Sequence, residues 1–250
     1  ENLTTGDANT AVGMNAGNDL TQGYYNTFIG YGAGAGKTTE IRNTAVGYAA
    51  GRAAGGGDNV SIGAWCGYGG TGDYNILIGS EVAYNATSIN RCVVIGRHAA
   101  QAGAFSGDEN VLIGYKSGYA ATSGKWNTAV GTDTLGNMTT ASGNVAVGYQ
   151  AGVGLTTGTR NTYVGEYAGK SNVTGSYNVA IGMEAGEAYT GSHDIAIGWK
   201  AHEVGVDEHG VYIGSQAGYV ATGASNVAIG YEALEGGSTT NNSVIIGAGA

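Results

Sequence analysis

Asn9-Thr10-Ala11-Val12-Gly13 is the first copy of a five-residue pattern, Asn-x-x-(Val/Ile)-Gly, that returns along the whole chain. The closing glycines of its fifteen copies are Gly13, Gly30, Gly47, Gly63, Gly79, Gly96, Gly114, Gly131, Gly148, Gly165, Gly182, Gly198, Gly214, Gly230 and Gly247. Successive closing glycines are 16, 17 or 18 residues apart. A period held this closely indicates one small unit stacked on itself. We therefore expect residues 1–250 to form a single repeat domain.

The composition excludes several other classes of protein. The 250 residues include 49 glycines and no proline, and 12% of them are charged. Collagen would need glycine at every third position, and a disordered chain would lack the recurring Val or Ile. No apolar run approaches the length of a membrane span. The net charge of -9 opposes binding to phosphate backbones and to anionic membranes, so we expect no nucleic acid partner and no membrane insertion.

The residue before each closing glycine is always Val or Ile, and the residue two places earlier is Thr, Val or Ile. Branched residues two apart share one side of a strand, so each copy predicts a short β-strand. We expect these aliphatics to face the interior and to carry the stability. Representative members are Val12, Ile29, Val46, Ile62 and Ile181. The position between them varies from Ala to Tyr, which predicts an outward face or a face against another subunit.

Two polar and glycine signals complete each repeat. The Asn that opens most copies, as at Asn9, Asn26 and Asn43, is expected to stack on its neighbours and form a hydrogen-bonded ladder. Cys92 stands in the same column, where we expect Cys92→Asn to be stabilising. The closing glycines, beginning with Gly13, Gly30 and Gly47, are assigned to the turns. A further glycine recurs seven residues before the closing one and is expected to need φ > 0.

These features predict an all-β protein, namely a β-solenoid (parallel β-roll) of fifteen coils of 16–18 residues. Each coil offers two large aliphatic side chains for burial, which is little against the entropy lost by ordering so many residues. Further burial between chains through the variable face would close the gap. We therefore expect a homo-oligomer.

The repeats also resemble known families. Residues 242–247, Asn-Ser-Val-Ile-Ile-Gly, resemble the Asn-Ser-Val-Ala-Ile-Gly signature of the head domains of trimeric autotransporter adhesins. The commoner form, Asn-Thr-Ala-Val-Gly-Tyr-x-Ala-Gly at residues 43–51, is similar to repeats of bacteriophage tail fibres. The resemblance implies a left-handed parallel β-roll, a homotrimer and a role in attachment to a cell surface. The adhesin heads have shorter coils than those here, which favours the phage fibre.

No constellation in the sequence predicts catalysis. The 19 acidic residues are scattered through the predicted turns and do not repeat as a cluster on adjacent coils. A polysaccharide-cleaving β-helix enzyme, which would use paired carboxylates, is therefore an alternative that we do not favour. His193 and His209 occupy the same phase of neighbouring coils and are a weak candidate for a transition-metal site. Otherwise we expect no metal and no cofactor.

Exposed aromatic rings are the better functional candidates. Rings directly after a closing glycine share one phase of the coil, and they can stack on sugar faces or pack on neighbouring coils. They are Tyr31, Tyr48, Tyr115, Tyr149, Trp199 and Tyr231. An ice-binding solenoid is a further alternative, but Thr10, Thr27 and Thr44 give way to Val or Ile at the same phase, and this irregularity argues against it.

The sequence therefore predicts a non-catalytic fibre or adhesin segment, cut from a longer fibrous chain, that attaches a phage virion to its host. The alternative within this class is the head of a bacterial trimeric surface adhesin. The expected partners are two further copies of the chain and a glycan or protein receptor on the host cell surface. The expected location is the virion tail fibre, or the cell surface and extracellular space.

Overall fold

The computed structural model describes residues 6–52, 55–70, 72–205, 208–236, 239 and 241–250. The chain divides into two compact units, of which unit 1 ends at Trp126 and unit 2 begins at Asn127. Both units are parallel β-solenoids with one three-residue strand per coil. The described residues contain no helix. The fold class predicted from the repeat, an all-β parallel β-solenoid, is therefore confirmed.

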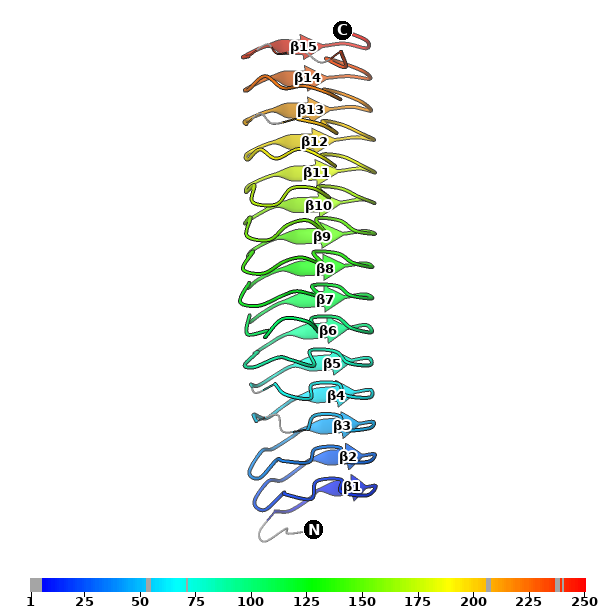
Figure 1. Cartoon of the computed structure of the whole chain (residues 1–250), viewed down its shortest axis with the longest axis vertical. Helices are drawn as coiled ribbons and strands as arrows, with labels where there is room; N and C mark the ends of the chain where they lie inside the picture. Colours follow the sequence, from blue (N-terminus) through cyan, green and yellow to red (C-terminus); the bar gives the residue numbers. More distant parts are fainter. Residues whose placement is uncertain (1–5, 53–54, 71, 206–207, 237–238, 240) are drawn as a thin grey trace. The chain divides into compact units, whose positions relative to one another are not determined.

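The strands fall at the predicted positions. Those of unit 1 are β1 (Thr10–Val12), β2 (Thr27–Ile29), β3 (Thr44–Val46), β4 (Val60–Ile62), β5 (Ile76–Ile78), β6 (Val93–Ile95) and β7 (Val111–Ile113). Those of unit 2 are β8 (Thr128–Val130), β9 (Val145–Val147), β10 (Thr162–Val164), β11 (Val179–Ile181), β12 (Ile195–Ile197), β13 (Val211–Ile213), β14 (Val227–Ile229) and β15 (Val244–Ile246). Within each unit, every strand pairs in parallel with the next one along the chain (Figure 1). Equivalent residues of successive repeats are direct register partners, as Thr27 and Thr44 are.

The two faces of the strands are the reverse of those predicted. The central residue is buried in every strand from β2 to β14, and Phe28, Leu112 and Tyr163 have no exposed surface. The branched residues on either side point outward, in contrast to the expectation that they form the core. The five named above lie as follows: Val12, Ile29, Ile62 and Ile181 are 57%, 40%, 37% and 38% exposed, and Val46 is half-buried. The variable position is therefore the interior and cannot form the predicted contact between subunits.

The interior accepts residues from Ala to Tyr because its other walls compensate for their volume. Tyr163 pairs in register with Ala146 on one side and Ala180 on the other. The turn that faces it supplies Gly152 and Gly169, where a Cβ would lie 2.7 Å and 2.5 Å from the tyrosine ring. A large central residue is therefore accommodated by small neighbours and a glycine wall, which keeps the packing dense without overpacking.

The closing glycines are required for two reasons. All of them have φ between +127° and +143°, a region that side-chain-bearing residues rarely adopt. In addition, a Cβ on Gly30 would lie 2.5 Å from the carbonyl oxygen of Gly47 in the next coil. The glycines seven residues earlier differ. Gly23, Gly107, Gly158 and Gly175 do not have positive φ, contrary to our prediction, although Gly72 does (φ +125°).

Those earlier glycines are explained by a close approach of backbone instead. A Cβ on Gly158 would lie 2.1 Å from the carbonyl oxygen of Gly175, and one on Gly107 would lie 1.9 Å from that of Gly124. Successive coils touch at these points, so no side chain fits between them. The glycine signal therefore reports contact between coils and not a left-handed backbone.

The predicted asparagine ladder is present. The Oδ1 atom of Asn144 accepts a hydrogen bond from the backbone N–H of Asn161 at 2.9 Å, and its Nδ2 donates to the carbonyl of Gly158 at 3.1 Å. The N–H of Asn144 in turn donates to Oδ1 of Asn127 at 3.0 Å. The same contacts recur at Asn26 in unit 1. Each amide thus satisfies buried backbone groups that would otherwise be costly to leave unpaired.

Cys92→Asn is expected to raise the free energy of unfolding by about 1–2 kcal/mol. The Cys92 N–H donates to Oδ1 of Asn75 at 3.0 Å, as in the rest of the column, but Sγ meets the carbonyl of Gly107 at 3.3 Å, where other copies place an amide. A thiol is a weak donor, and burial raises its pKa, so it stays neutral. Thermal unfolding measures the gain. The reverse exchange, Asn144→Cys, should lower the melting temperature, and a lower value for Cys92→Asn would contradict the ladder's role.

Candidate functional site

The six predicted aromatic residues are all exposed, but only two of them touch. Tyr31 and Tyr48 stack with ring centroids 5.1 Å apart and planes inclined by 9°. Tyr115 and Tyr149 contact His98 and Tyr167 respectively, edge to face. The two remaining candidates, Trp199 and Tyr231, lie beside Lys200 and Glu232. The structure therefore brings together one pair in unit 1 and no continuous row in unit 2.

Three residues that the sequence reasoning missed extend the pair in unit 1. Trp65 lies 5.0 Å from Tyr48, and it contacts Tyr68 at 5.0 Å and Tyr84 at 6.1 Å between ring centroids. We call the five rings Tyr31, Tyr48, Trp65, Tyr68 and Tyr84 the aromatic cluster. Trp65 is two residues after its closing glycine, and Tyr68 and Tyr84 are five after theirs. A search limited to one phase of the coil could not find them.

The rings of the cluster differ in how well their faces are covered. Tyr68 and Tyr84 stack in parallel, with centroids 5.1 Å apart and planes at 9°, so each covers a face of the other. Trp65 instead makes angles of 59°, 63° and 70° with its three ring neighbours. Among the residues that the structure describes, no ring is stacked parallel to the indole. The stacked tyrosines therefore stabilise the contact between coils, whereas Trp65 is the ring of the cluster that we consider for contact with a ligand.

Two surface hollows border the cluster. One has a volume of about 290 Å³ and is lined by Trp65, Glu81 and Tyr84. The other, of about 230 Å³, is lined by Asn15, Asn18, Asp19, Tyr31, Gly32, Ala35, Gly36 and Arg52. The Arg52 guanidinium lies 5.7 Å from the centre of the Tyr68 ring, a cation–π contact. Each of the two hollows is therefore lined by aromatic and polar side chains together.

The outward face of each sheet is the second candidate. In unit 1 the residues before the closing glycines form one rank and those two places earlier form another, so that β-branched side chains cover the face. Ile29, Ile62 and Ile76 are 40%, 37% and 42% exposed, and unit 2 presents Val145, Ile181 and Ile229 at 36–39%. A repeated apolar face of this kind marks an interaction surface.

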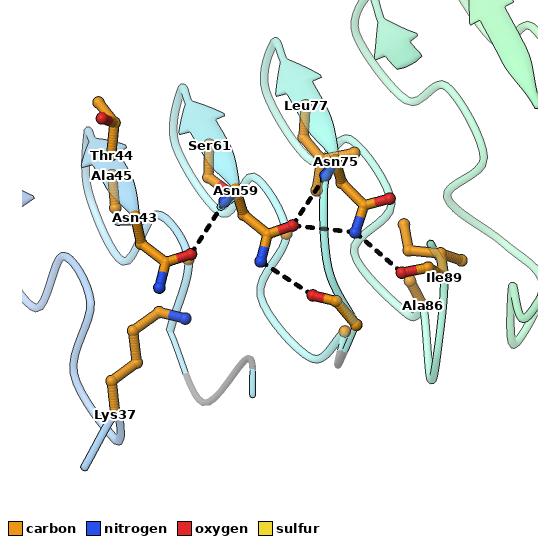
Figure 2. A pocket seen from close by; sticks show the side chains of 14 residues that line it. Lys37, Asn43, Thr44, Ala45, Asn59, Ser61, Asn75, Leu77, Ala86 and Ile89 are labelled. Carbon is orange, nitrogen blue, oxygen red and sulfur yellow. Dashed lines mark hydrogen bonds between the residues drawn. The ribbon is translucent and has the colours of Figure 1, made fainter. Parts of the chain in front are cut away.

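An internal cavity of about 20 Å³ lies in unit 1, beside Lys37 and Asn43 (Figure 2). Ala45 and Ser61 leave this space because they are the small members of the inward column. The volume suits at most about one water molecule, so the cavity is not a site for an organic ligand. Lys37 is 2% exposed, and burial of the ammonium lowers its pKa to about 8, against the opposing effect of Glu40.

The histidine pair lies where the sequence placed it, but its geometry favours stacking. The His193 and His209 rings have centroids 5.0 Å apart and planes at 6°, and Tyr177 continues the stack. Neither histidine belongs to a metal-compatible group among the described residues, and Asp207 lies outside them. Asp194 belongs to the asparagine ladder, where its Oδ1 accepts the Gly210 N–H at 2.8 Å.

One acidic group does have the spacing for a metal ion. It consists of Glu184, Glu187 and Glu203. Lys200 Nζ lies 2.8 Å from Glu184 and 2.9 Å from Glu203, while Lys170 Nζ bonds to Glu187 at 2.9 Å. The two ammonium groups already balance most of this charge, so the group is an ion-pair network on the surface of unit 2.

Comparison with models of protein families, with curated proteins and with solved structures found no match. In the part of the chain that the structure describes, no helix has the length and apolar character needed to cross a membrane. The class that the fold defines is the parallel β-solenoid.

Proposed function

We propose that this chain is a non-catalytic structural segment of an attachment fibre that assembles as a homotrimer. The observation that carries the proposal is the outward apolar face of the solenoid. It repeats in every coil, and in a separate chain it leaves residues such as Ile29 and Ile181 in water. Burying a Val or Ile side chain contributes about 1.5–3 kcal/mol, so covering even part of this face would favour association.

A second copy of the chain is the occupant that suits this face best. Within each unit the face is repetitive and has no charged residue in its strands, and each copy of the chain would offer the same residues. Three copies around one axis bury one such face each. This arrangement replaces the contact through the variable position, which the structure turns inward.

The molar mass of the whole chain in solution tests the assembly. Light scattering after size exclusion should give three copies per particle. One copy at micromolar concentration would overturn the homotrimer. If such a monomer also showed thermal hysteresis, the outward ranks of Thr, Val and Ile would be assigned to ice binding instead.

The attachment role is supported by the motif resemblance and by the aromatic cluster, whose rings are exposed or half-buried. A phage fibre is preferred because of the coil length. The fibre would then belong to the virion and contact a glycan or protein on the host cell surface. The assembled protein should bind whole bacterial cells or their surface polysaccharides in a panel of strains. The bacterial adhesin would be favoured if the protein bound none of these strains and a bacterium that carried it on its surface attached to animal tissue.

A further inference from the structure

The hollow beside Trp65 has the composition of a small sugar-binding site. Trp65 and Tyr84 form two of its walls, with centroids 6.1 Å apart and planes inclined by 70°. Pyranose rings present apolar C–H faces that pack on aromatic rings, and the half-buried indole of Trp65 contributes part of its surface to the hollow. The hollow has a volume of about 290 Å³ and is open to solvent with three lining residues, so it suits contact with one face of a single sugar ring and not enclosure of a ligand.

Glu81 supplies the polar wall of this hollow. Its side chain is 36% exposed, and His98 Nδ1 lies 3.5 Å from its Oε2 atom. Gln101 Nε2 donates to the same oxygen. The hydrogen bond from Gln101 therefore holds the carboxylate through Oε2, and His98 Nδ1 is near it without a hydrogen bond. A carboxylate accepts from neighbouring hydroxyl groups, and hydrogen bonds to a charged acceptor are strong.

The charge of the site limits the class of sugar. The carboxylate of Glu81 repels anionic ligands, and the net charge of -9 adds to this effect over the surface. Uronic acids, sialic acids and phosphorylated sugars are disfavoured for this reason. A neutral hexose has both the apolar face for Trp65 and the hydroxyl donors for Glu81.

We propose that Trp65, Tyr84 and Glu81 form a binding site for a neutral hexose unit of a surface glycan. This inference rests on the proposed attachment role and deepens it by naming the ligand class. None of these three residues is among the six aromatic residues predicted from their position directly after a closing glycine. Trp65 would contact the sugar face, and Glu81 would select against acidic sugars.

Titration of the whole chain with neutral hexose oligosaccharides and with the matching uronic acids tests the site. Saturation-transfer NMR and tryptophan fluorescence should report binding of the neutral series. Trp65→Ala should weaken it by about tenfold or more. Glu81→Gln, which keeps the shape and the coil, should weaken the neutral sugar and reduce the discrimination against the uronic acid.

Trp126→Ala is the matched control, because Trp126 is an exposed indole of unit 1 outside the hollow, and its Nε1 donates to Oε2 of Glu109 at 2.8 Å. It should bind as the parent does. Absence of neutral-sugar binding, equal loss in Trp126→Ala, or preference for the acidic series in the parent would each overturn the inference. Light scattering on the same samples separates the two proposals, because a monomer that binds neutral sugar through Trp65 would contradict only the homotrimer.

Discussion

Ala180→Asp is expected to lower the free energy of unfolding by about 3–5 kcal/mol, whereas Ile181→Asp should leave the coil folded. The two residues are neighbours in β11, but Ala180 is fully buried and Ile181 is 38% exposed. An aspartate at position 180 would place a carboxylate in the interior, between Ala196 and the ring of Tyr163. An aspartate at position 181 would lie on the outward face and keep its water.

The two variants also differ in how their effects depend on protein concentration. Ala180→Asp should destabilise the chain equally at all concentrations, as measured by denaturant unfolding with amide hydrogen exchange in β11. Ile181→Asp should instead shift the particle mass towards the monomer on dilution, because it places charge on the proposed contact between copies. A folded, trimeric Ala180→Asp, or an Ile181→Asp that unfolds without change of mass, would mean that the faces are assigned wrongly.

The period and the hydrogen-bonding pattern were predictable from the sequence because backbone geometry imposes them on every coil. A strand must recur wherever the stack does, and each opening Asn serves the same carbonyl of the next coil, as Asn144 and Gly158 illustrate. The closing glycines follow from the close contact between coils, as at Gly30 and Gly47. Because these constraints are the same in nearly every coil, they produce a repeated pattern of Asn and Gly that can be recognised in one sequence without an alignment.

The direction of the faces could not be predicted from one column taken alone. Variability at the central position suggested an outward face, but the interior is filled by several columns whose volumes compensate. Tyr212 lies in register between Ala196 and Ala228, and a Cβ at Gly218 would lie 2.0 Å from its ring. For the aromatic members Phe28, Tyr163 and Tyr212, comparison with the central residues one coil before and after would have shown an alanine on both sides.

The turns and the aromatic cluster contain features with no clear sequence signal. Between one and three described residues of each coil have positive φ although they are not glycine, as Tyr25 (φ +61°) and Ala49 (φ +51°) do. Hydrogen bonds to the equivalent turns of adjacent coils stabilise this backbone conformation, and no single residue type is found at these positions. Trp65, at φ +58°, is one of these residues, and its direction depends on that turn. Its contact with Tyr84 therefore follows from backbone geometry, which residue spacing does not report.

Lys37→Met is expected to raise the free energy of unfolding by at most about 3 kcal/mol at pH 7, because methionine removes a buried charge but also the interaction that Lys37 makes. Lys37 occupies the inward position that Leu20 holds one coil earlier, and both residues are almost fully buried. Burial lowers the pKa of Lys37 from 10.5 to about 8. The difference between these two values corresponds to about 3 kcal/mol, which the folded protein loses by holding a charge in its interior. Methionine fills the same space without that charge.

The sign of the pH dependence follows from the two protonation states. Below pH 8 both the folded and the unfolded chain hold the proton, so the cost of burying the charge is complete. Between pH 8 and 10.5 the unfolded chain still binds the proton that the folded chain has lost, so stability rises with pH. The advantage of Lys37→Met should therefore be constant below pH 8, decline through this window and vanish above it.

Denaturant unfolding of the parent and the variant at pH 7 and pH 10 measures this difference, and groups that titrate in both proteins cancel. Lys170→Met is the matched control, because the hydrogen bond that Lys170 donates to Glu187 raises the pKa of Lys170, and burial opposes this effect only partly. Removing that ion pair should give no gain at pH 7. An equal gain in both variants would show a general effect of methionine, and a gain at Lys37 that persisted at high pH would show that packing, and not the buried charge, limits the stability of this coil.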